Sequence, residues 1–380
     1  MPLFDVYPLF DIEPVKASGS WLWGADGRRY LDLYGGHAVI SIGHSHPHYV
    51  QKITGQLNRI GFYSNSVKIP GQLEVADKLG ALSGYPDYPL FLVNSGAEAN
   101  ENAFKLASFH TGRKKIISFS KAFHGRTSAA VAATDNPAIV APLNENDRFV
   151  FVPFNDSAAL ETAVDGETAA VIIEGIQGVG GVQVPTADFL KHIRQLCDRH
   201  GALMILDEVQ SGYGRTGDFF AHQQAGVQPD IISMAKGMGN GFPVGGILIH
   251  PSIAAKHGML GTTFGGNHLA CAAASAVLDV IKDEDLLTNA ARTGNWFINE
   301  LSARPGIREV RGRGLMIGAE LEIPCAPVRK ALLEEHGIFT GSSSDKNTIR
   351  ILPALNIGEE EAGIFFEAFD KVMKKQKFEA

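Results

Sequence analysis

Short apolar runs that end at a glycine or a polar residue recur through the middle of the chain. The clearest run covers residues 202–206 and is ended by Asp207. Comparable runs occupy residues 115–119, 149–153, 169–174, 230–235 and 244–249. Apolar runs of this length, without alternating polar positions, are typical of strands buried on both faces of a parallel sheet. We therefore predict that these segments form one sheet.

Segments in which apolar residues follow helical spacing lie between these runs. Residues 97–110 carry this pattern, and further helices are expected at 47–60, 186–200 and 268–282. Alternation of strands and helices through residues 90–250 indicates right-handed βαβ units in one large α/β domain.

The two ends of the chain follow other patterns. Residues 21–23 and 30–33 flank an Asp-Gly turn and predict a small hairpin. From about residue 283 the charge increases, and three helical stretches enclose short strand-like pieces. We predict an N-terminal segment, 1–45, that packs with a small α+β domain, 283–380, and a large domain, 46–282, between them. Gly312-Arg313-Gly314 is expected to form a turn.

Composition limits the classes of partner. The chain has 380 residues, 45% of them hydrophobic and 20% charged, as in ordinary soluble globular proteins. The net charge of −7 and the dispersed basic residues disfavour nucleic acid and anionic membranes as partners. No apolar run approaches the roughly 20 residues that a membrane helix requires.

The N-terminal sequence and the spacing of the cysteines favour a cytoplasmic protein. The first 20 residues carry acids and prolines in place of the basic and apolar regions of a secretory signal. The three cysteines are widely spaced and odd in number, which indicates neither a disulfide framework nor a zinc site. A reducing compartment is therefore expected.

Two candidate catalytic side chains stand at predicted strand ends. Asp207 occupies the carboxyl end of its strand, where open α/β sheets bind ligands, although an acid there can also cap a loop. Lys236 follows the run 230–235 and precedes a glycine-rich loop. Desolvation beside an anion-binding loop would make its amine nucleophilic, whereas many loop lysines are simply exposed.

Two further segments suggest ligand contacts. Ser95, Gly96 and Ala97 open the helix at 97–110, and free backbone N–H groups at such a start bind phosphate; a plain N-cap by Asn94 or Ser95 is the alternative. Phe123 and Arg126 follow the run 115–119. This pair would stack on a ring and bind a carboxylate, or would only pack a loop.

Two other motifs are weighed and disfavoured. Residues 212–217 fit the G-x-G-x-x-G dinucleotide fingerprint of NAD-dependent dehydrogenases, but no long helix with a following acid is predicted after them, so this alternative is disfavoured. His44, His46 and His48 alternate in a way that suits a metal. Pro47 and the lack of a neighbouring Cys or acid favour a turn instead, so no metal site is predicted.

Taken together, these motifs resemble the class III aminotransferases, fold type I enzymes that use pyridoxal 5'-phosphate. The resemblance runs from Gly19-Ser-Trp-Leu-Trp-Gly-Ala-Asp-Gly27 to Arg350-Ile-Leu-Pro. Its most specific parts are Asp207-Glu-Val-Gln210 and Ala235-Lys236-Gly237. The resemblance implies a large, mainly parallel α/β domain with a smaller α+β domain.

The resemblance also implies cofactor-binding roles. Lys236 would hold the cofactor covalently and then move a proton, and Asp207 would keep the pyridine nitrogen protonated. Val209 and Phe123 would pack on opposite faces of the ring, and Gln210 would reach its hydroxyl group. Ser95, Gly96 and Ala97 would surround the phosphate. Thr263 is similar to the threonine that binds this phosphate from the neighbouring subunit, which implies a homodimer.

Within class III, Phe123-His-Gly-Arg-Thr127 and Thr262-Thr-Phe-Gly-Gly-Asn267 look most like the acetylornithine aminotransferases of arginine biosynthesis. These enzymes transfer the δ-amino group of an acylated ornithine to 2-oxoglutarate. Arg126 would bind the donor's α-carboxylate, Arg350 that of 2-oxoglutarate or glutamate, and Thr262 would line the same pocket. Succinylornithine, free ornithine or a lysine derivative are alternative donors.

Three positions depart from the family pattern. The loop that usually reads E-P-x-Q-G-E-G-G has Gly175 in place of the proline and Val179 in place of the second acid. In the family this acid pairs with the arginine matched by Arg350. His268 replaces the usual proline after Asn267. These departures bear on the choice of donor.

Overall fold

A computed structural model describes residues 3–379 of the chain, which contain a seven-stranded sheet of order β4-β10-β9-β8-β7-β5-β6. Its strands are β4 (Leu90–Val93), β5 (Lys115–Phe119), β6 (Phe149–Val152), β7 (Thr168–Glu174), β8 (Leu203–Asp207), β9 (Ile231–Met234) and β10 (Gly245–Ile249). β10 pairs antiparallel with both neighbours, and the strands from β9 to β6 pair in parallel. The predicted mainly parallel α/β sheet is confirmed.

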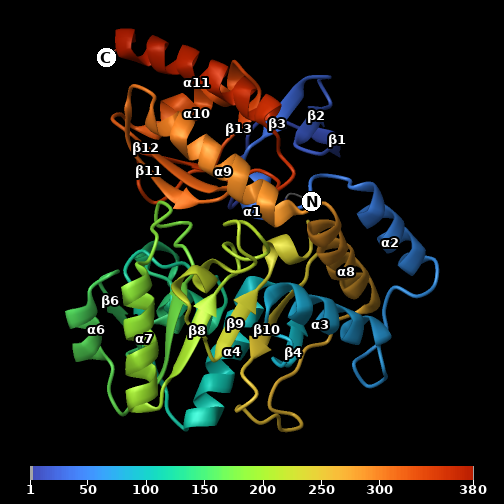
Figure 1. Cartoon of the computed structure of the whole chain (residues 1–380), viewed down its shortest axis with the longest axis vertical. Coiled ribbons are helices and arrows are strands. Elements are labelled where there is room, and N and C mark those ends of the chain that lie inside the picture. The colour runs from blue at the N-terminus through green and yellow to red at the C-terminus, as the bar shows by residue number, and fades with distance from the viewer. Residues whose placement is uncertain (1–2, 380) are drawn as a thin grey trace.

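Helices cover both faces of this sheet, as its uninterrupted apolar runs require. Val171 and Ile173 of β7 belong to the apolar cluster that packs under α7 (Ala187–His200). Ala170 and Ile172 point the other way, into the cluster under α4 (Gly96–Thr111). Figure 1 shows the sheet in the lower part of the molecule, with helices around it. The other helices of this part are α1 (Gly35–Ala38), α2 (Pro47–Leu57), α3 (Pro70–Ser83), α5 (Ser128–Ala132), α6 (Ser157–Ala163) and α8 (His268–Asp283).

The helix α3 was not among the predicted elements. Its buried stripe is short, and Pro70, Gly71 and Gly80 dilute the apolar repeat. Both glycines allow close packing, because a Cβ at either would lie 2.9 Å from its neighbour, Cys271 or the backbone of Pro86.

The predicted N-terminal hairpin is present, and it joins the C-terminal part of the chain. Its strands β1 (Pro14–Ser18), β2 (Trp21–Gly24) and β3 (Arg29–Asp32) are antiparallel, and β3 pairs in parallel with β13 (Ile338–Phe339). The boundaries proposed near residues 45 and 282 stay predictions.

A separate three-stranded antiparallel sheet has the order β11-β12-β14. Its strands are β11 (Ile307–Arg313), β12 (Met316–Leu321) and β14 (Thr348–Ile351). The turn expected at 312–314 was misplaced, because Gly312 and Arg313 are the last residues of β11. Phe297, Phe365 and Phe369 are buried in the apolar core of this part. Its helices are α9 (Leu286–Ser302), α10 (Cys325–Glu334) and α11 (Glu359–Glu379), drawn in orange and red in Figure 1.

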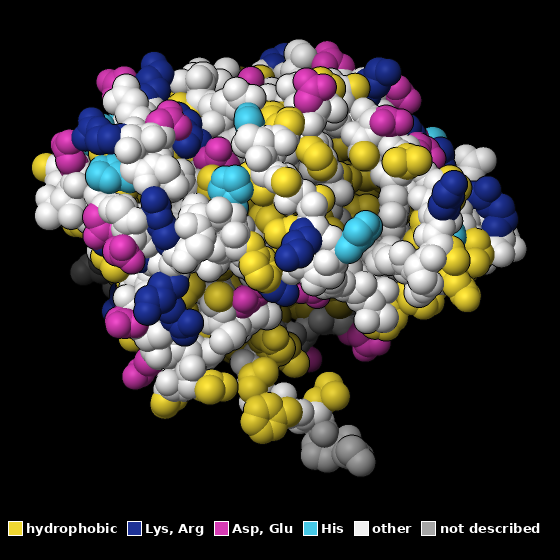
Figure 2. Space-filling view, turned by 90° about the horizontal axis from the view of Figure 1, so that it is seen from below, with side chains coloured by type: hydrophobic (Ala, Val, Ile, Leu, Met, Phe, Trp, Pro, Cys, Tyr) yellow, Lys and Arg dark blue, Asp and Glu magenta, His cyan; other side chains and the backbone are white. Residues whose placement is uncertain are grey.

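Within residues 3–379, no helix combines the length and the apolar composition needed to cross a membrane. On the face shown in Figure 2, Lys and Arg side chains are interspersed with Asp and Glu. Nothing here tests the expected absence of nucleic acid, which stays a prediction.

Candidate active site

A pocket of about 240 Å³ lies at the carboxyl ends of β7, β8 and β9. Of the residues proposed from the sequence, it is lined by Gly96, Ala97, Phe123, Arg126, Asp207, Val209, Gln210 and Lys236. The parallel sheet thus brings together side chains that are far apart in the chain. Ser95, Thr262, Thr263 and Arg350 lie outside its lining.

Asp207 is the last residue of β8 and is almost completely buried. Its Oδ2 accepts hydrogen bonds from Asn100 Nδ2 at 2.8 Å and from His124 Nδ1 at 2.7 Å. Its Oδ1 accepts from the backbone N–H of Val209 at 3.0 Å. These three donors fix the orientation of the carboxylate at the pocket.

Lys236 follows β9 with a left-handed backbone, φ 46°, and its side chain reaches the same pocket. Burial lowers the pKa of its amine, and the nearby carboxylates of Asp207 and Glu174 oppose that shift. The turn after Lys236 is fixed from another part of the chain, because Ser41 Oγ donates to Gly237 O at 2.7 Å. A buried amine in a fixed backbone is suited to act as a nucleophile and proton carrier.

The N-terminus of α4 forms one wall of the pocket. Ser95 is the N-cap, and its hydroxyl accepts from the N–H of Glu98 at 3.2 Å. A Cβ on Gly96 would lie 2.6 Å from Cγ1 of Val209, so only glycine lets the helix approach this side chain. The first N–H groups of a helix have no partner within it, and they attract anions.

Glu174 and His124 are pocket residues to which the sequence had assigned no role. Glu174 Oε1 accepts from the N–H of Phe123, and Oε2 accepts from the N–H of Gly178, both at 3.0 Å. Burial raises the pKa of Glu174 to about 7. The position of Glu174 at the end of β7, next to β8, was the signal that could have identified it.

Arg350 projects from β14 and is only 4% exposed. Its Nε donates to Ser342 O, and its Nη1 donates to Gln210 Oε1 at 3.2 Å. Among the ion pairs of the described residues, none involves Arg350, so its partners there are neutral. Burial lowers the pKa of this guanidinium.

The remaining proposed residues are differently placed. Arg126 is exposed at the pocket, and its guanidinium makes no hydrogen bond or ion pair within residues 3–379. Thr262 Oγ1 accepts from the N–H of Gly265 at 3.1 Å and from Asn94 Nδ2 at 3.3 Å. Thr263 is exposed. Neither threonine lines this pocket, so the proposed roles of Thr262 in the substrate pocket and of Thr263 in a neighbouring subunit stay predictions.

The two disfavoured motifs have other surroundings. His44, His46 and His48 contact three different carboxylates, those of Asp32, Glu284 and Asp279. The glycine-rich segment 212–217 forms successive turns and opens no long helix. A Cβ on its last glycine would lie 2.9 Å from the Cβ of Ala291 in α9, so this glycine serves packing.

The pocket fits pyridoxal 5'-phosphate by the chemistry of its groups. It combines a helix N-terminus for a phosphate, a fixed buried carboxylate for a pyridinium nitrogen and a buried amine for an aldehyde. Phe123 and Val209 line it as apolar walls suited to a flat ring.

Comparisons with known proteins agree with this chemistry. Residues 5–373 match the family described as aminotransferase class-III. The chain is 43% identical over 371 residues to an acetylornithine aminotransferase of Corynebacterium efficiens, covering 94% of this chain and 92% of the relative. It is 41% identical over 350 residues to an acetylornithine aminotransferase of Methanosarcina mazei, covering 91% and 88%.

Solved structures that are similar to this chain are also aminotransferases. An ornithine aminotransferase from Toxoplasma gondii has a TM-score of 0.91 at 30% identity, covering 98% of this chain and 93% of that chain. An acetylornithine aminotransferase from Elizabethkingia anophelis has a TM-score of 0.85 at 33% identity, covering 97% and 95%. The chain therefore belongs to the class III aminotransferases, a family of pyridoxal-phosphate-dependent transferases.

Proposed function

We propose that this enzyme transfers the δ-amino group of an N-acylated ornithine, first of all N-acetylornithine, to 2-oxoglutarate. The two half-reactions would alternate in one pocket, and the product would enter arginine biosynthesis in the cytoplasm. The observation that carries the proposal is that the buried Asp207 and the half-buried Lys236, whose amine is desolvated, line one pocket beside the N-terminus of α4. Relatives named acetylornithine aminotransferase support the choice of donor.

The residues of the pocket would bind the cofactor and move a proton. Gly96 and Ala97 would bind the phosphate of pyridoxal 5'-phosphate through backbone N–H groups, with Ser95 holding the helix start. Asp207 would keep the ring nitrogen protonated. When bound, the cofactor supplies an electron-accepting ring. Lys236 would attach it and, once released, would take a proton from the substrate carbon and deliver it to the cofactor.

Two cations would bind substrate carboxylates. Arg126, exposed at the pocket, would bind the α-carboxylate of the acylornithine, and Arg350 that of 2-oxoglutarate or glutamate. Gln210 lines the pocket and accepts a hydrogen bond from Arg350, so it would link the two sites. Free ornithine is the second candidate donor, favoured by the similarity to the ornithine aminotransferase from Toxoplasma gondii.

We also propose a homodimer with shared active sites. Thr263 is exposed and outside its own pocket, as expected for a residue that binds the phosphate of a neighbouring subunit. Large apolar side chains are also exposed: the neighbouring Phe264 by 59%, Leu57 of α2 by 60% and Leu73 of α3 by 71%. Exposed apolar surface of this kind marks interaction sites.

Spectroscopy and donor screening test the proposal. The purified protein should be yellow, and borohydride reduction should fix the cofactor on the peptide that contains Lys236. Lys236→Ala should bind the cofactor and lose turnover. A colourless protein that ignores added cofactor, or a label elsewhere, would end the cofactor assignment. Donors should then be compared with 2-oxoglutarate as acceptor, and a strong preference for free ornithine would overturn the choice of an acylated donor.

A further inference from the structure

A row of residues crosses the three-stranded sheet. In the register of β11, β12 and β14, Arg311 is opposite Gly318, and Gly318 is opposite Arg350. Residues that oppose each other in antiparallel strands project to the same face. A Cβ on Gly318 would lie 2.8 Å from the Cβ of Val182, so the loop 175–182 rests on the sheet at this glycine. This loop, which follows β7 and carries Val179 into the pocket, therefore lies over the sheet between the two arginines.

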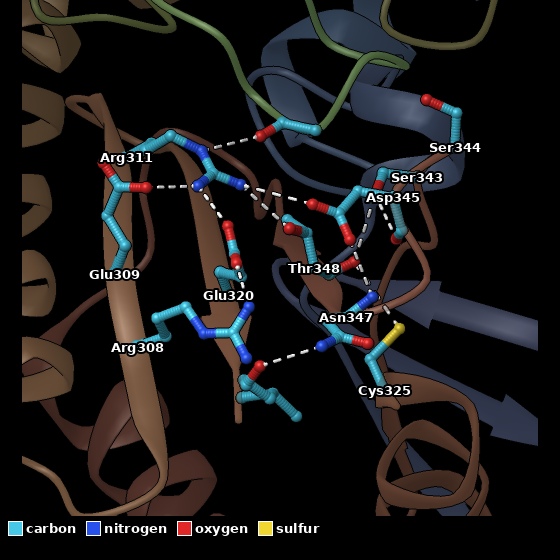
Figure 3. A network of polar contacts seen from close by, with 12 residues as sticks. Arg308, Glu309, Arg311, Glu320, Cys325, Ser343, Ser344, Asp345, Asn347 and Thr348 are labelled. Atoms are coloured by element: carbon cyan, nitrogen blue, oxygen red, sulfur yellow. Dashed lines mark hydrogen bonds and ion pairs between the residues drawn. The ribbon is translucent and has the colours of Figure 1, made fainter. Parts of the chain in front are cut away.

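Arg311 holds the loop from one side. Its Nε donates to Gly181 O at 3.2 Å, as the upper dashed line in Figure 3 shows. Its Nη1 contacts the carboxylates of Glu309 and Glu320, and its Nη2 donates to Thr348 Oγ1 at 2.9 Å. Glu309 and Glu320 oppose each other in the register, where two carboxylates repel. The guanidinium offsets this repulsion, and the bonds to both carboxylates fix its orientation toward the loop.

A second contact holds the same loop two residues away. Ser344 donates to Val179 O through its backbone N–H at 2.9 Å and its Oγ at 3.1 Å. Ser344 belongs to the segment before β14 that also carries Ser342, the carbonyl partner of Arg350. The three-stranded sheet and its connecting segment thus bind two carbonyl groups of loop 175–182.

The position of the loop controls Gln210. A Cβ on Gly178 would lie only 1.7 Å from Gln210 Oε1, so the glycine backbone packs directly against this amide. The same oxygen accepts the hydrogen bond from Arg350 Nη1. A shift of the loop would leave the Gln210 amide held by the bond from its Nε2 to His37 O, at 3.1 Å. Arg350 would stay held by Ser342 O, so the shift would loosen the contact between Gln210 and Arg350.

We propose that Arg311 is a positioning residue for the dicarboxylate substrate. By holding Gly181, it keeps loop 175–182 against Gln210 and so keeps Arg350 directed toward the substrate carboxylate. Arg311 itself touches no substrate. The proposal deepens the proposed function and rests on it for the identity of the dicarboxylate, glutamate or 2-oxoglutarate.

The test compares three holoenzyme variants with wild type. Arg311→Met removes the loop contact and the charge. Arg311→Lys keeps a charge beside Glu309 and Glu320 but cannot span the carboxylates and Gly181 O together. Arg308→Met is the matched control, because Arg308 lies on the same strand and also bonds Glu320, at 2.9 Å, but makes no hydrogen bond or ion pair with loop 175–182 within residues 3–379.

Single-turnover kinetics are measured with glutamate and with N-acetylornithine. The ratio of the two specificity constants does not depend on the fraction of folded enzyme. The ratio is the specificity constant for glutamate divided by that for N-acetylornithine. Both Arg311 variants should lower this ratio about tenfold, mainly because glutamate binds more weakly, since small misplacements of a binding group are costly. Arg308→Met should stay within about twofold of wild type. An unchanged ratio in Arg311→Met, a wild-type ratio in Arg311→Lys, or an equal effect of Arg308→Met would overturn the proposal.

The wild-type enzyme separates this result from failure of the proposed function. If it reacts with glutamate but ignores N-acetylornithine, the donor assignment fails, and free ornithine replaces N-acetylornithine in the ratio. The role of Arg311 is then tested in the same way. A wild-type enzyme that ignores glutamate overturns both proposals.

Discussion

The substitution Asp207→Asn tests the central electrostatic feature of the pocket. It keeps the size of the side chain and removes its charge. In wild type, both carboxylate oxygens accept hydrogen bonds, Oδ2 from Asn100 and His124 and Oδ1 from the N–H of Val209. An asparagine has only one acceptor oxygen, so its NH₂ group must face at least one of these donors.

The magnitude follows from burial and hydrogen bonding. A hydrogen bond to a charged group contributes about 1.5–3 kcal/mol, and a buried donor left without a partner costs about 1–3 kcal/mol. A change of tautomer would not relieve His124, because its Nε2 is buried and has no partner among the described residues. The rate depends on the contact between the charged carboxylate and the protonated ring nitrogen. With Asp207 only 4% exposed, we expect the loss of this contact to reach the upper end of the range of about 1.5–3 kcal/mol, about 3 kcal/mol in the activation barrier, or roughly a hundredfold in rate.

Single-turnover rates at saturating donor measure this effect. The maximal rate should fall much more than donor binding weakens, since the charge is needed mainly in the transition state. Asn100→Ala is the control, because it removes one donor and keeps the carboxylate; its rate should stay closer to wild type. A rate for Asp207→Asn within about tenfold of wild type would refute the assignment of Asp207 to the ring nitrogen.

Two further substitutions test other walls of the pocket. Burial raises the pKa of Glu174 from 4.5 to about 7. The folded protein therefore holds the proton more tightly than the unfolded chain does, and this stabilises the fold fully below pH 4.5. The stabilisation is lost as the pH rises to about 7, which lowers the free energy of unfolding by about 3 kcal/mol. Glu174→Gln cannot ionise and so does not lose this stability. The difference between the melting temperatures of the variant and of wild type should therefore increase from about pH 5 to pH 8, and a constant difference would contradict the raised pKa of Glu174. Gly96→Ala would place a Cβ 2.6 Å from Val209 Cγ1 and should weaken cofactor binding in a titration, while Gly166→Ala, in open space, should not. Equal affinities of these two variants for the cofactor would show that Gly96 does not contribute to cofactor binding.

The fold was predictable where one physical signal dominated. Strands buried on both faces appear as uninterrupted apolar runs, which located β5 and β7 to β10, and the apolar run of β6 was found as well although it is a partly exposed edge strand. β11 carries the sequence IREVRGR, and its charged residues bond across the sheet and to loop 175–182, so no apolar pattern marks it. Short-range patterns do not reveal a strand whose polar side chains find partners from distant segments.

The site was predictable in part for the same reason. Asp207 and Lys236 stand at ends of strands in a parallel sheet, and such ends meet at one edge. The role of Glu174 was missed because its partners, the N–H groups of Phe123 and Gly178, come from two separate loops. The opposition of Arg311 and Arg350 across Gly318 depends on strand register, which the sequence does not specify without the turns.

Val179 offers a test of how the pocket selects between donors. Arg350 is buried, and its hydrogen-bond partners are the neutral oxygens of Gln210 and Ser342. A buried guanidinium without a carboxylate is costly, so a substrate carboxylate that reaches Arg350 gains affinity. Glutamate should therefore be bound well in the second half-reaction, and a succinylated ornithine, whose extra carboxylate reaches toward Arg350, should compete with N-acetylornithine as the acylated donor.

Val179→Glu would place a carboxylate in this pocket wall as a competing partner for Arg350. Losing one charge-assisted interaction of about 1.5–3 kcal/mol should lower the single-turnover preference for glutamate about 10- to 100-fold. The matched control is Val179→Gln, which has the same size and no charge and should change the preference far less. Both variants retain the main-chain carbonyl of residue 179 that Ser344 binds, so the loop should keep its place. If Val179→Glu and Val179→Gln shift the glutamate to N-acetylornithine ratio equally, bulk rather than charge governs this wall, and Arg350 is not the free cation that distinguishes the donors.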